Sequence, residues 1–147
     1  NLTLFELFSI TSNEKCKLFI GFDSGSSHLL HYYTNCIILY TACNHNGWRP
    51  FTNNEWFTLV NSPNCVIESS TIGNFKKYIA YVPLKCRTCY DIMCDNPVCK
   101  KLDVDCIVNL IKTFIDSWFL NTSSNPLFFS DPLNSYVIIV QRYQRII

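Results

Sequence analysis

The sequence lacks the features that define several large classes of protein. No apolar run approaches the roughly 18–20 residues that a helix needs to cross a bilayer, which excludes a transmembrane segment. No internal repeat and no low-complexity tract is present, so solenoid and low-complexity architectures are excluded as well. The net charge is only +1, which excludes a strong overall field that would draw the chain to nucleic acid or to an anionic membrane.

What is present is the composition of an ordinary folded domain. The chain has 147 residues, of which 48% are hydrophobic and 15% are aromatic, and this is enough to bury a core. No linker rich in proline, glycine or serine divides it. The sequence therefore predicts one globular domain over residues 1–147.

Apolar periodicity predicts the α+β fold class. Patterns typical of strands occur at 2–10, 16–22, 36–40, 75–82 and 136–140, and 52–60 is compatible with a strand or a short helix. One long helix is predicted at about 103–120, because apolar side chains recur there at intervals of three and four residues, and Asp103 and Asp105 suit the positive end of a helix dipole. Its predicted apolar stripe consists of Val104, Ile107, Val108, Ile111, Phe114, Ile115, Trp118 and Phe119. The predicted architecture is a mixed sheet of about five to six strands packed against this helix.

Four of the nine cysteines lie within a cysteine-rich loop at 86–99, with the spacing C-x2-C-x4-C-x4-C. They are Cys86, Cys89, Cys94 and Cys99. Four thiolates at this spacing can complete a tetrahedral shell around one zinc ion. The spacing resembles that of the retroviral-type zinc knuckle, with Cys94 where that family has histidine, and with Tyr90 and Met93 where it usually has glycine. The resemblance implies one structural zinc ion held by these four cysteines.

Basic and aromatic side chains surround this cluster and predict a surface for a partner. They are Lys85, Arg87, Tyr90, Lys100 and Lys101. Cationic side chains beside an aromatic ring are what proteins use to bind single-stranded nucleic acid, which is one interpretation. The same cations can simply solvate the loop or lower the pKa of nearby thiols. We favour a zinc clasp that holds the loop in shape for a protein partner, and the sequence indicates no oligomeric state.

The alternative chemistry for the cysteines is oxidation to disulfides. Because nine is an odd number, complete pairing would leave one thiol over, and Cys36 with Cys43, or Cys16 with Cys65, are possible pairs. The sequons that begin at Asn1 and at Asn121 suit this alternative, which is a secreted, disulfide-bonded interaction module. A metal-bound, reduced cluster predicts an intracellular protein instead, and this is the interpretation that we favour.

A second motif, Asp23-Ser24-Gly25, follows the predicted strand 16–22. An apolar strand that leads into Asp-Ser-Gly-Ser-Ser resembles the active-site turn of aspartic proteases, in which two carboxylates share a proton. The resemblance implies that Asp23 is the catalytic carboxylate, on a turn shaped by Ser24 and Gly25 and supported by Ser26. The chain has no second Asp-Thr/Ser-Gly and no glycine-rich flap, so such a protease would need to be a homodimer. We favour a polar turn between two strands.

Thiol catalysis is a further alternative, because Cys36 lies near His28, His31 and His45, which are all the histidines of the chain. A nucleophilic thiol needs an imidazole that activates it and a group that orients the imidazole. Papain-like enzymes have their histidine far downstream of the cysteine, and no histidine follows His45. The sequence therefore predicts no catalytic residue and a protein that is not an enzyme.

Residue usage bears on the origin of the chain. Phe, Tyr, Asn, Ile, Leu and Cys are abundant, Ala, Gly, Glu and Arg are scarce, and the chain has only eight lysines. This usage is similar to that of coronavirus and related nidovirus polyproteins, which implies a viral protein in the host cytoplasm. The predicted function is thus a non-enzymatic, zinc-stabilised, cysteine-rich viral domain that contacts a protein or nucleic-acid partner.

Overall fold

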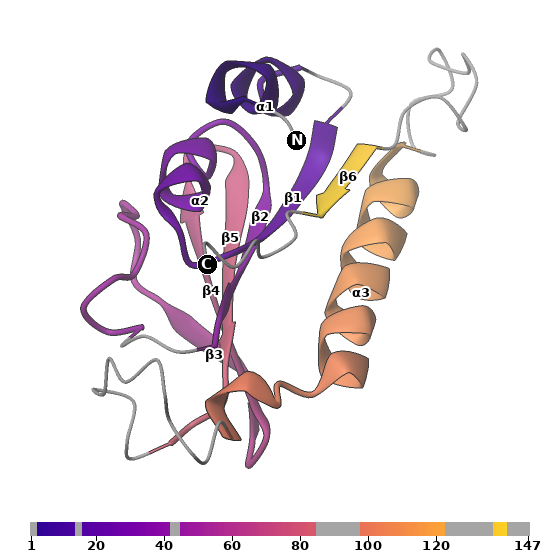
Figure 1. Ribbon diagram of the computed structural model, residues 1–147. Helices are drawn as coiled ribbons and strands as arrows, with labels where there is room; N and C mark the ends of the chain where they lie inside the picture. Colours follow the sequence, from indigo (N-terminus) through magenta and orange to yellow (C-terminus); the bar gives the residue numbers. More distant parts are fainter. Residues whose placement is uncertain (1–2, 14–15, 42–44, 85–97, 123–136, 141–147) are drawn as a thin grey trace.

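The protein is built around one six-stranded mixed sheet with helices on both faces (Figure 1). The computed structural model describes residues 3–13, 16–41, 45–84, 98–122 and 137–140. In their order across the sheet, the strands are β3 (Phe57–Ser62), β4 (Cys65–Ile72), β5 (Phe75–Tyr81), β2 (Cys36–Tyr40), β1 (Cys16–Phe22) and β6 (Val137–Val140). The helices are α1 (Leu4–Thr11), α2 (Gly25–Leu30), α3 (Val104–Thr122) and the short 3-10 helix η1 (Val98–Lys100). The sheet and the long helix α3 confirm the predicted α+β class.

The sheet has an antiparallel part and a parallel part. Strands β3, β4 and β5 are antiparallel neighbours, whereas β5, β2, β1 and β6 run parallel to one another. Parallel neighbours need a crossover connection, and α2 supplies it between β1 and β2. The carboxyl ends of β1, β2 and β5 therefore meet at a single edge of the sheet.

Side chains along each strand point alternately to the two faces of the sheet, so the core consists of two layers. One face of the sheet buries Phe19, Ile38 and Ile79 against Leu7 of α1 and Leu30 of α2. The other face buries Ile20, Ile37, Ile67 and Ala80 against Ile107 and Phe114 of α3. Figure 1 shows α1 and α2 on one side of the strands and α3 on the other. The two faces are thus covered by different segments of the chain.

Helix α3 forms as predicted, but its buried side is narrower than the predicted stripe. Ile107 and Phe114 are buried, whereas Val104 is 71% exposed and Val108 is 38% exposed. Among the side chains of α3 that the structure describes, those packed on the sheet lie on the side of Ile107, Ile111 and Phe114. Val108 lies about 100° around the helix from Ile107, and Val104 is the first residue of the helix. The assignment of Val104 and Val108 to the core is therefore wrong.

The predicted strand at 2–10 is also wrong, because this segment forms α1. The Oγ1 atom of Thr3 accepts a hydrogen bond from the backbone N–H of Glu6 (3.2 Å), and the Glu6 carboxylate accepts one from the N–H of Thr3 (2.7 Å). This reciprocal capping box satisfies two N–H groups that a helix start otherwise leaves unpaired. The undecided segment 52–60 contains the start of β3, and β4 was not predicted.

Gly21 lets α2 lie close against β1. A Cβ atom at this position would lie 2.6 Å from Ser27 Oγ and 2.7 Å from the ring of Phe19. The space is used by Ser27, whose hydroxyl donates to the carbonyl of Phe22 at 2.6 Å. The start of α2 is therefore fixed against the carboxyl end of β1.

Lys77 ties the other end of α2 to the sheet. Its side chain is fully buried on β5, and its Nζ atom donates to the carbonyl oxygens of His31 and Thr34, the latter at 2.6 Å. A cation is favourable here because the carbonyl groups at the end of a helix carry partial negative charge. Burial lowers the pKa of Lys77 to about 8, although the neighbouring Cys36 raises it.

Candidate functional site

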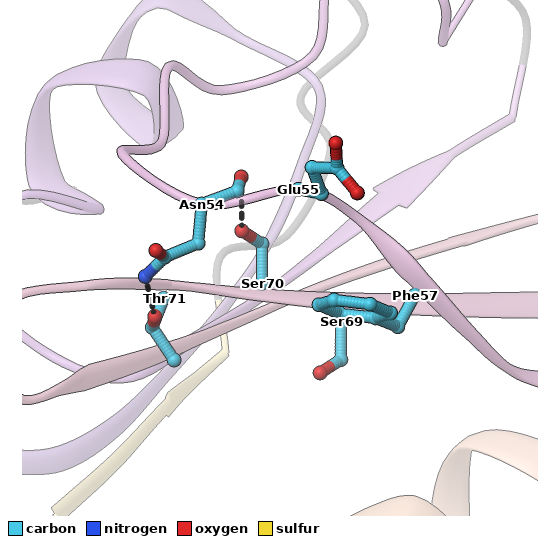
Figure 2. Close-up of a pocket in the computed structure, with 6 residues that line it drawn as sticks. All are labelled: Asn54, Glu55, Phe57, Ser69, Ser70 and Thr71. Carbon is cyan, nitrogen blue, oxygen red and sulfur yellow. Dashed lines mark hydrogen bonds between the residues drawn. The ribbon is translucent and has the colours of Figure 1, made fainter.

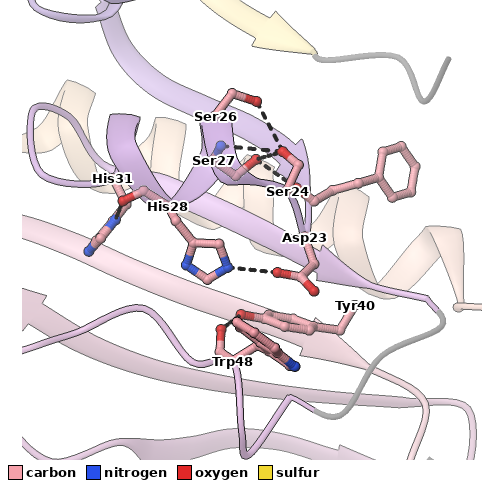
Figure 3. Close-up of polar contacts among 9 residues, drawn as sticks. Asp23, Ser24, Ser26, Ser27, His28, His31, Tyr40 and Trp48 are labelled. Atoms are coloured by element: carbon pink, nitrogen blue, oxygen red, sulfur yellow. Dashed lines mark hydrogen bonds and ion pairs between the residues drawn. The ribbon is translucent and has the colours of Figure 1, made fainter. Parts of the chain in front are cut away.

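The carboxyl edge of the parallel strands is where this kind of sheet favours a ligand site. In open sheets with parallel strands, ligands bind outside the carboxyl ends of the strands. Asp23 directly follows β1, and Tyr40 and Tyr81 are the last residues of β2 and β5. Figure 3 shows Asp23, His28, Tyr40 and Trp48 close together at this edge.

An Asp–His pair lies at this edge of the sheet. The Oδ1 atom of Asp23 lies 2.7 Å from Nε2 of His28, and both side chains are half-buried (Figure 3). Ser24 caps α2, because its Oγ atom accepts a hydrogen bond from the N–H of Ser27 at 3.3 Å. The predicted polar turn is therefore confined to Asp23 and Ser24, and the chain continues as a helix from Gly25.

The geometry at Asp23 differs from the one that the aspartic-protease resemblance implies. There, a second carboxylate shares a proton with the first. Here Asp23 has the imidazole of His28 as its neighbour, and its turn opens a helix within a mixed sheet. An Asp–His pair can orient an imidazole for acid–base chemistry, but this alone defines no reaction.

The histidines do not form an activated thiol site with Cys36. Cys36 is fully buried, and burial raises its pKa to about 11, the opposite of what a nucleophile needs. His28 pairs with Asp23, and the ring nitrogens of His31 face the carbonyl oxygens of His28 and Phe51. His45 stacks on Tyr81 with ring centroids 3.6 Å apart.

A buried polar cluster holds the segment after β2 onto the sheet. Arg49 lies 2.6 Å from Glu68 of β4, and the hydroxyl of Tyr81 donates to the same carboxylate at 3.0 Å. The hydroxyl of Tyr40 donates to the carbonyl of Trp48. Sequence reasoning missed this cluster. Its role is structural, because the contacts of Arg49 and Trp48 join the segment to the sheet, and the bond from Tyr81 to Glu68 joins β5 to β4.

The only part of the predicted zinc site that the structure describes is Cys99. It lies in η1 as a half-buried free thiol, and Lys100 and Lys101, which follow it, are exposed. The other predicted residues lie outside the described ranges; they are Cys86, Cys89 and Cys94 as ligands, and Lys85, Arg87 and Tyr90 as partner contacts. Among the residues that the structure describes, no group of three His, Cys, Asp or Glu side chains could hold a metal ion. The zinc site stays a prediction.

The proposed disulfide between Cys16 and Cys65 does not fit the sheet. Cys16 is on β1 and Cys65 is on β4, and β2 and β5 lie between these strands. Three inter-strand steps separate them by roughly 14 Å, whereas bridged cysteines have Cα atoms closer than about 7 Å. Cys43, the suggested partner of Cys36, lies outside the described residues.

A shallow pocket lies beside β3 and β4 (Figure 2). It is near the start of β5, at the end of the sheet opposite to the carboxyl edge of the parallel strands. Its volume is about 430 Å³, and it is lined by Asn54, Glu55, Phe57, Ser69, Ser70 and Thr71. Several of its polar groups already have partners, since Asn54 Nδ2 donates to Thr71 Oγ1 and Ser70 Oγ donates to the carbonyl of Asn54 (2.9 Å). The pocket contains no pair of groups suited to acid–base chemistry.

Comparison with known proteins gives no relative: no family model, no curated protein and no solved structure matches this chain. Within the described ranges, none of the helices has both the length and the apolar character to cross a membrane. Function must therefore be argued from the geometry of the chain itself.

Proposed function

We propose that this chain is a non-enzymatic, cysteine-rich interaction domain that uses the region around Cys99 and the start of α3 to contact a protein partner. One zinc ion, held by Cys86, Cys89, Cys94 and Cys99, would keep the cysteine-rich loop in shape. Reduced thiolates need a reducing compartment, so the proposal includes an intracellular location. The viral residue usage suits the host cytoplasm.

The observation that carries the proposal is the exposed surface that follows Cys99. Lys100 and Lys101 are exposed, and so are Val104 and Val108 on the first turns of α3. Val104 and Val108 are four residues apart and therefore neighbours on one side of the helix. Apolar side chains next to two cations fit a partner surface that has both apolar and acidic groups.

This mixture favours a protein over single-stranded nucleic acid. A nucleic-acid site needs cations along the backbone path and aromatic platforms for the bases. The described surface next to Cys99 offers valines instead of aromatic rings, and the chain as a whole carries a net charge of only +1. Apolar contact area contributes more to the free energy of binding a protein than to that of binding phosphate groups.

Hydrogen bonds and packing hold the proposed binding surface in a fixed position. The backbone N–H of Asp103 donates to the carbonyl of Asn64 in the β3–β4 turn (3.4 Å), and the side chain of Asp103 accepts from the N–H groups of Asp105 (3.0 Å) and Cys106 (3.3 Å). Leu102 packs against the core. The residues that present the surface are thus held by the sheet on one side and by a capped helix on the other.

Zinc content and thiol counting test the metal. We expect one zinc ion per chain by elemental analysis, and its loss in Cys99→Ser but not in Cys16→Ser, whose thiol is buried on β1. Peptide mapping that finds disulfides within 86–99, with no zinc, would replace this proposal by the secreted, disulfide-bonded module.

The kind of partner is tested by selecting, from a displayed random-peptide library, the peptides that bind the zinc-loaded protein. Selected peptides should combine apolar and acidic residues, and a double variant with Val104→Ser and Val108→Ser should lose binding. Asn109→Ala, at another exposed position of α3, is the matched control and should bind normally. Binding of single-stranded RNA that depends on Lys100 and Lys101 but not on the valines would identify a nucleic-acid domain instead.

A further inference from the structure

Two cysteines that are far apart in the sequence meet where α3 docks on the sheet. Cys65 is the first residue of β4 and is fully buried, and Cys106 is in the first turn of α3 and is half-buried. The Cys106 thiol is near enough to Cys65 to raise the pKa of the Cys65 thiol, in addition to the effect of burial. Both cysteines are free, and Cys106 packs against the core cluster that contains Cys65.

The backbone on both sides holds these two thiols together. Asn64, the residue before Cys65, accepts a hydrogen bond from the backbone N–H of Asp103 at 3.4 Å. The Asp103 side chain in turn accepts from the N–H of Cys106 at 3.3 Å. Ile107, which follows Cys106, is buried in the same core cluster. The position of Cys106 next to the start of β4 is therefore set by the way α3 is attached to the sheet.

The two thiols are not equivalent. Burial raises the pKa of Cys65 to about 12, and the neighbouring Cys106 adds to this effect. Cys65 is fully buried, whereas Cys106 is the more exposed of the two. An accessible thiol next to a buried partner thiol is the arrangement in which the first attacks an oxidant and the second completes a disulfide.

We propose that Cys65 and Cys106 form a reversible disulfide that joins β4 to α3, with glutathione disulfide as the oxidant. The Cys106 thiolate attacks one sulfur of glutathione disulfide and expels one glutathione thiolate, which takes up a proton. Cys65 then loses its proton, and its sulfur attacks Cys106 and expels the second glutathione. Two protein thiols are oxidised to one disulfide, and one glutathione disulfide is reduced to two glutathione molecules.

The crosslink would close a covalent ring over residues 65–106. This ring contains β4, β5 and the cysteine-rich loop at 86–99. Closing a ring of this size removes entropy from the unfolded chain, so the oxidised protein should unfold at a higher temperature than the reduced one. The proposal does not depend on zinc, because neither thiol belongs to the predicted zinc site.

The test incubates the folded, zinc-supplemented protein in glutathione buffers of stepwise increasing oxidised fraction. Free thiols are then alkylated and the disulfides are mapped by peptide mass spectrometry. We expect a peptide linked through Cys65 and Cys106 as the dominant product that contains Cys65, at a yield independent of protein concentration. Its formation should raise the thermal midpoint by roughly 5–15 °C and should reverse with added reductant.

Cys106→Ser should remove both the linked peptide and the rise in midpoint. Cys36→Ser, which changes a fully buried thiol on β2, is the control and should retain both. Cys65→Ala serves as a second variant if Cys106→Ser folds poorly. The proposal fails if the linked peptide is absent from the folded, oxidised protein, or if Cys65 pairs equally with several cysteines.

Discussion

Replacing Lys77 by methionine should change the pH dependence of folding in a direction that the structure determines. The ammonium group is buried on β5 and donates to the carbonyl oxygens of His31 and Thr34. Burial lowers its pKa from 10.5 to about 8 in the folded protein. Between these two values the unfolded chain holds a proton that the folded chain has released, so stability must rise as pH rises through this window.

The size of the effect follows from the pKa of Lys77. Between pH 7 and pH 9 the folded lysine loses most of its proton while the unfolded lysine keeps it, which corresponds to a gain of about 1 kcal/mol in the free energy of unfolding. The neighbouring His31 and Cys36 are present in both the wild type and Lys77→Met, so the comparison of the two proteins removes their direct contributions. Burial lowers the pKa of His31 below 6.5, and it raises the pKa of Cys36 to about 11, where the unfolded thiol ionises from about 9 upward.

Urea unfolding at pH 7, 8 and 9 under reducing conditions measures this gain. We expect the free energy of unfolding of the wild type, relative to Lys77→Met, to rise by about 1 kcal/mol over this range. Lys76→Met, at the adjacent exposed position, should keep the wild-type slope. Parallel profiles for the wild type and Lys77→Met would refute the reasoning, because they would show that Lys77 does not titrate between pH 7 and 9.

Two further predictions test the packing of the helices by urea unfolding. Gly21→Ala should cost about 1–3 kcal/mol, because the new Cβ would lie 2.6 Å from Ser27 Oγ, whereas Gly25→Ala, with nothing within 4 Å of its Cβ, should stay within about 0.5 kcal/mol. Similar losses at the two glycines would mean that α2 does not approach β1 this closely. Phe114→Ala should cost about 3–5 kcal/mol and Val108→Ala under about 1 kcal/mol, and equal losses would place the buried side of α3 elsewhere.

The parts of the fold that were predictable are those whose own residues decide their structure. Helix α3 has apolar side chains every three or four residues over several turns, and this period outweighs any local ambiguity. Strand β2 is a continuous run of apolar residues that includes the β-branched Ile37 and Ile38 and the aromatic Tyr40, and its burial on both faces agrees with that pattern. The sequence did not show which face of each element is covered, because this depends on the partner element.

The errors have identifiable physical causes. Residues 2–10 alternate like a strand, but the capping box of Thr3 and Glu6 makes the helical start more favourable, and this signal was present in the sequence. Strand β4 was missed because Glu68 and the three residues after it are polar. Glu68 is nonetheless buried, since Arg49 and Tyr81 from distant parts of the chain bind its carboxylate.

The candidate site was predictable only in part. The Asp23 motif was visible in the sequence, but its pairing with His28 depends on the helix that begins at Gly25. The spacing of Cys86 to Cys99 identifies possible ligands, yet spacing alone does not distinguish thiolates on zinc from disulfides. The contact of Cys65 with Cys106 depends on how α3 docks, which no local pattern encodes.

The place of β1 in the sheet has a consequence for how the chain is made. Its two neighbours are β2, which follows it closely, and β6, the last strand that the structure describes. While a ribosome is still adding the residues between β2 and β6, β1 can already pair with β2. The other edge of β1 then keeps unpaired N–H and C=O groups beside apolar side chains such as Leu18 and Ile20. Contacts between such distant segments form slowly. The nascent protein is therefore open to pairing with foreign strands until residues 137–140 arrive, and a chain that stopped before them would stay so.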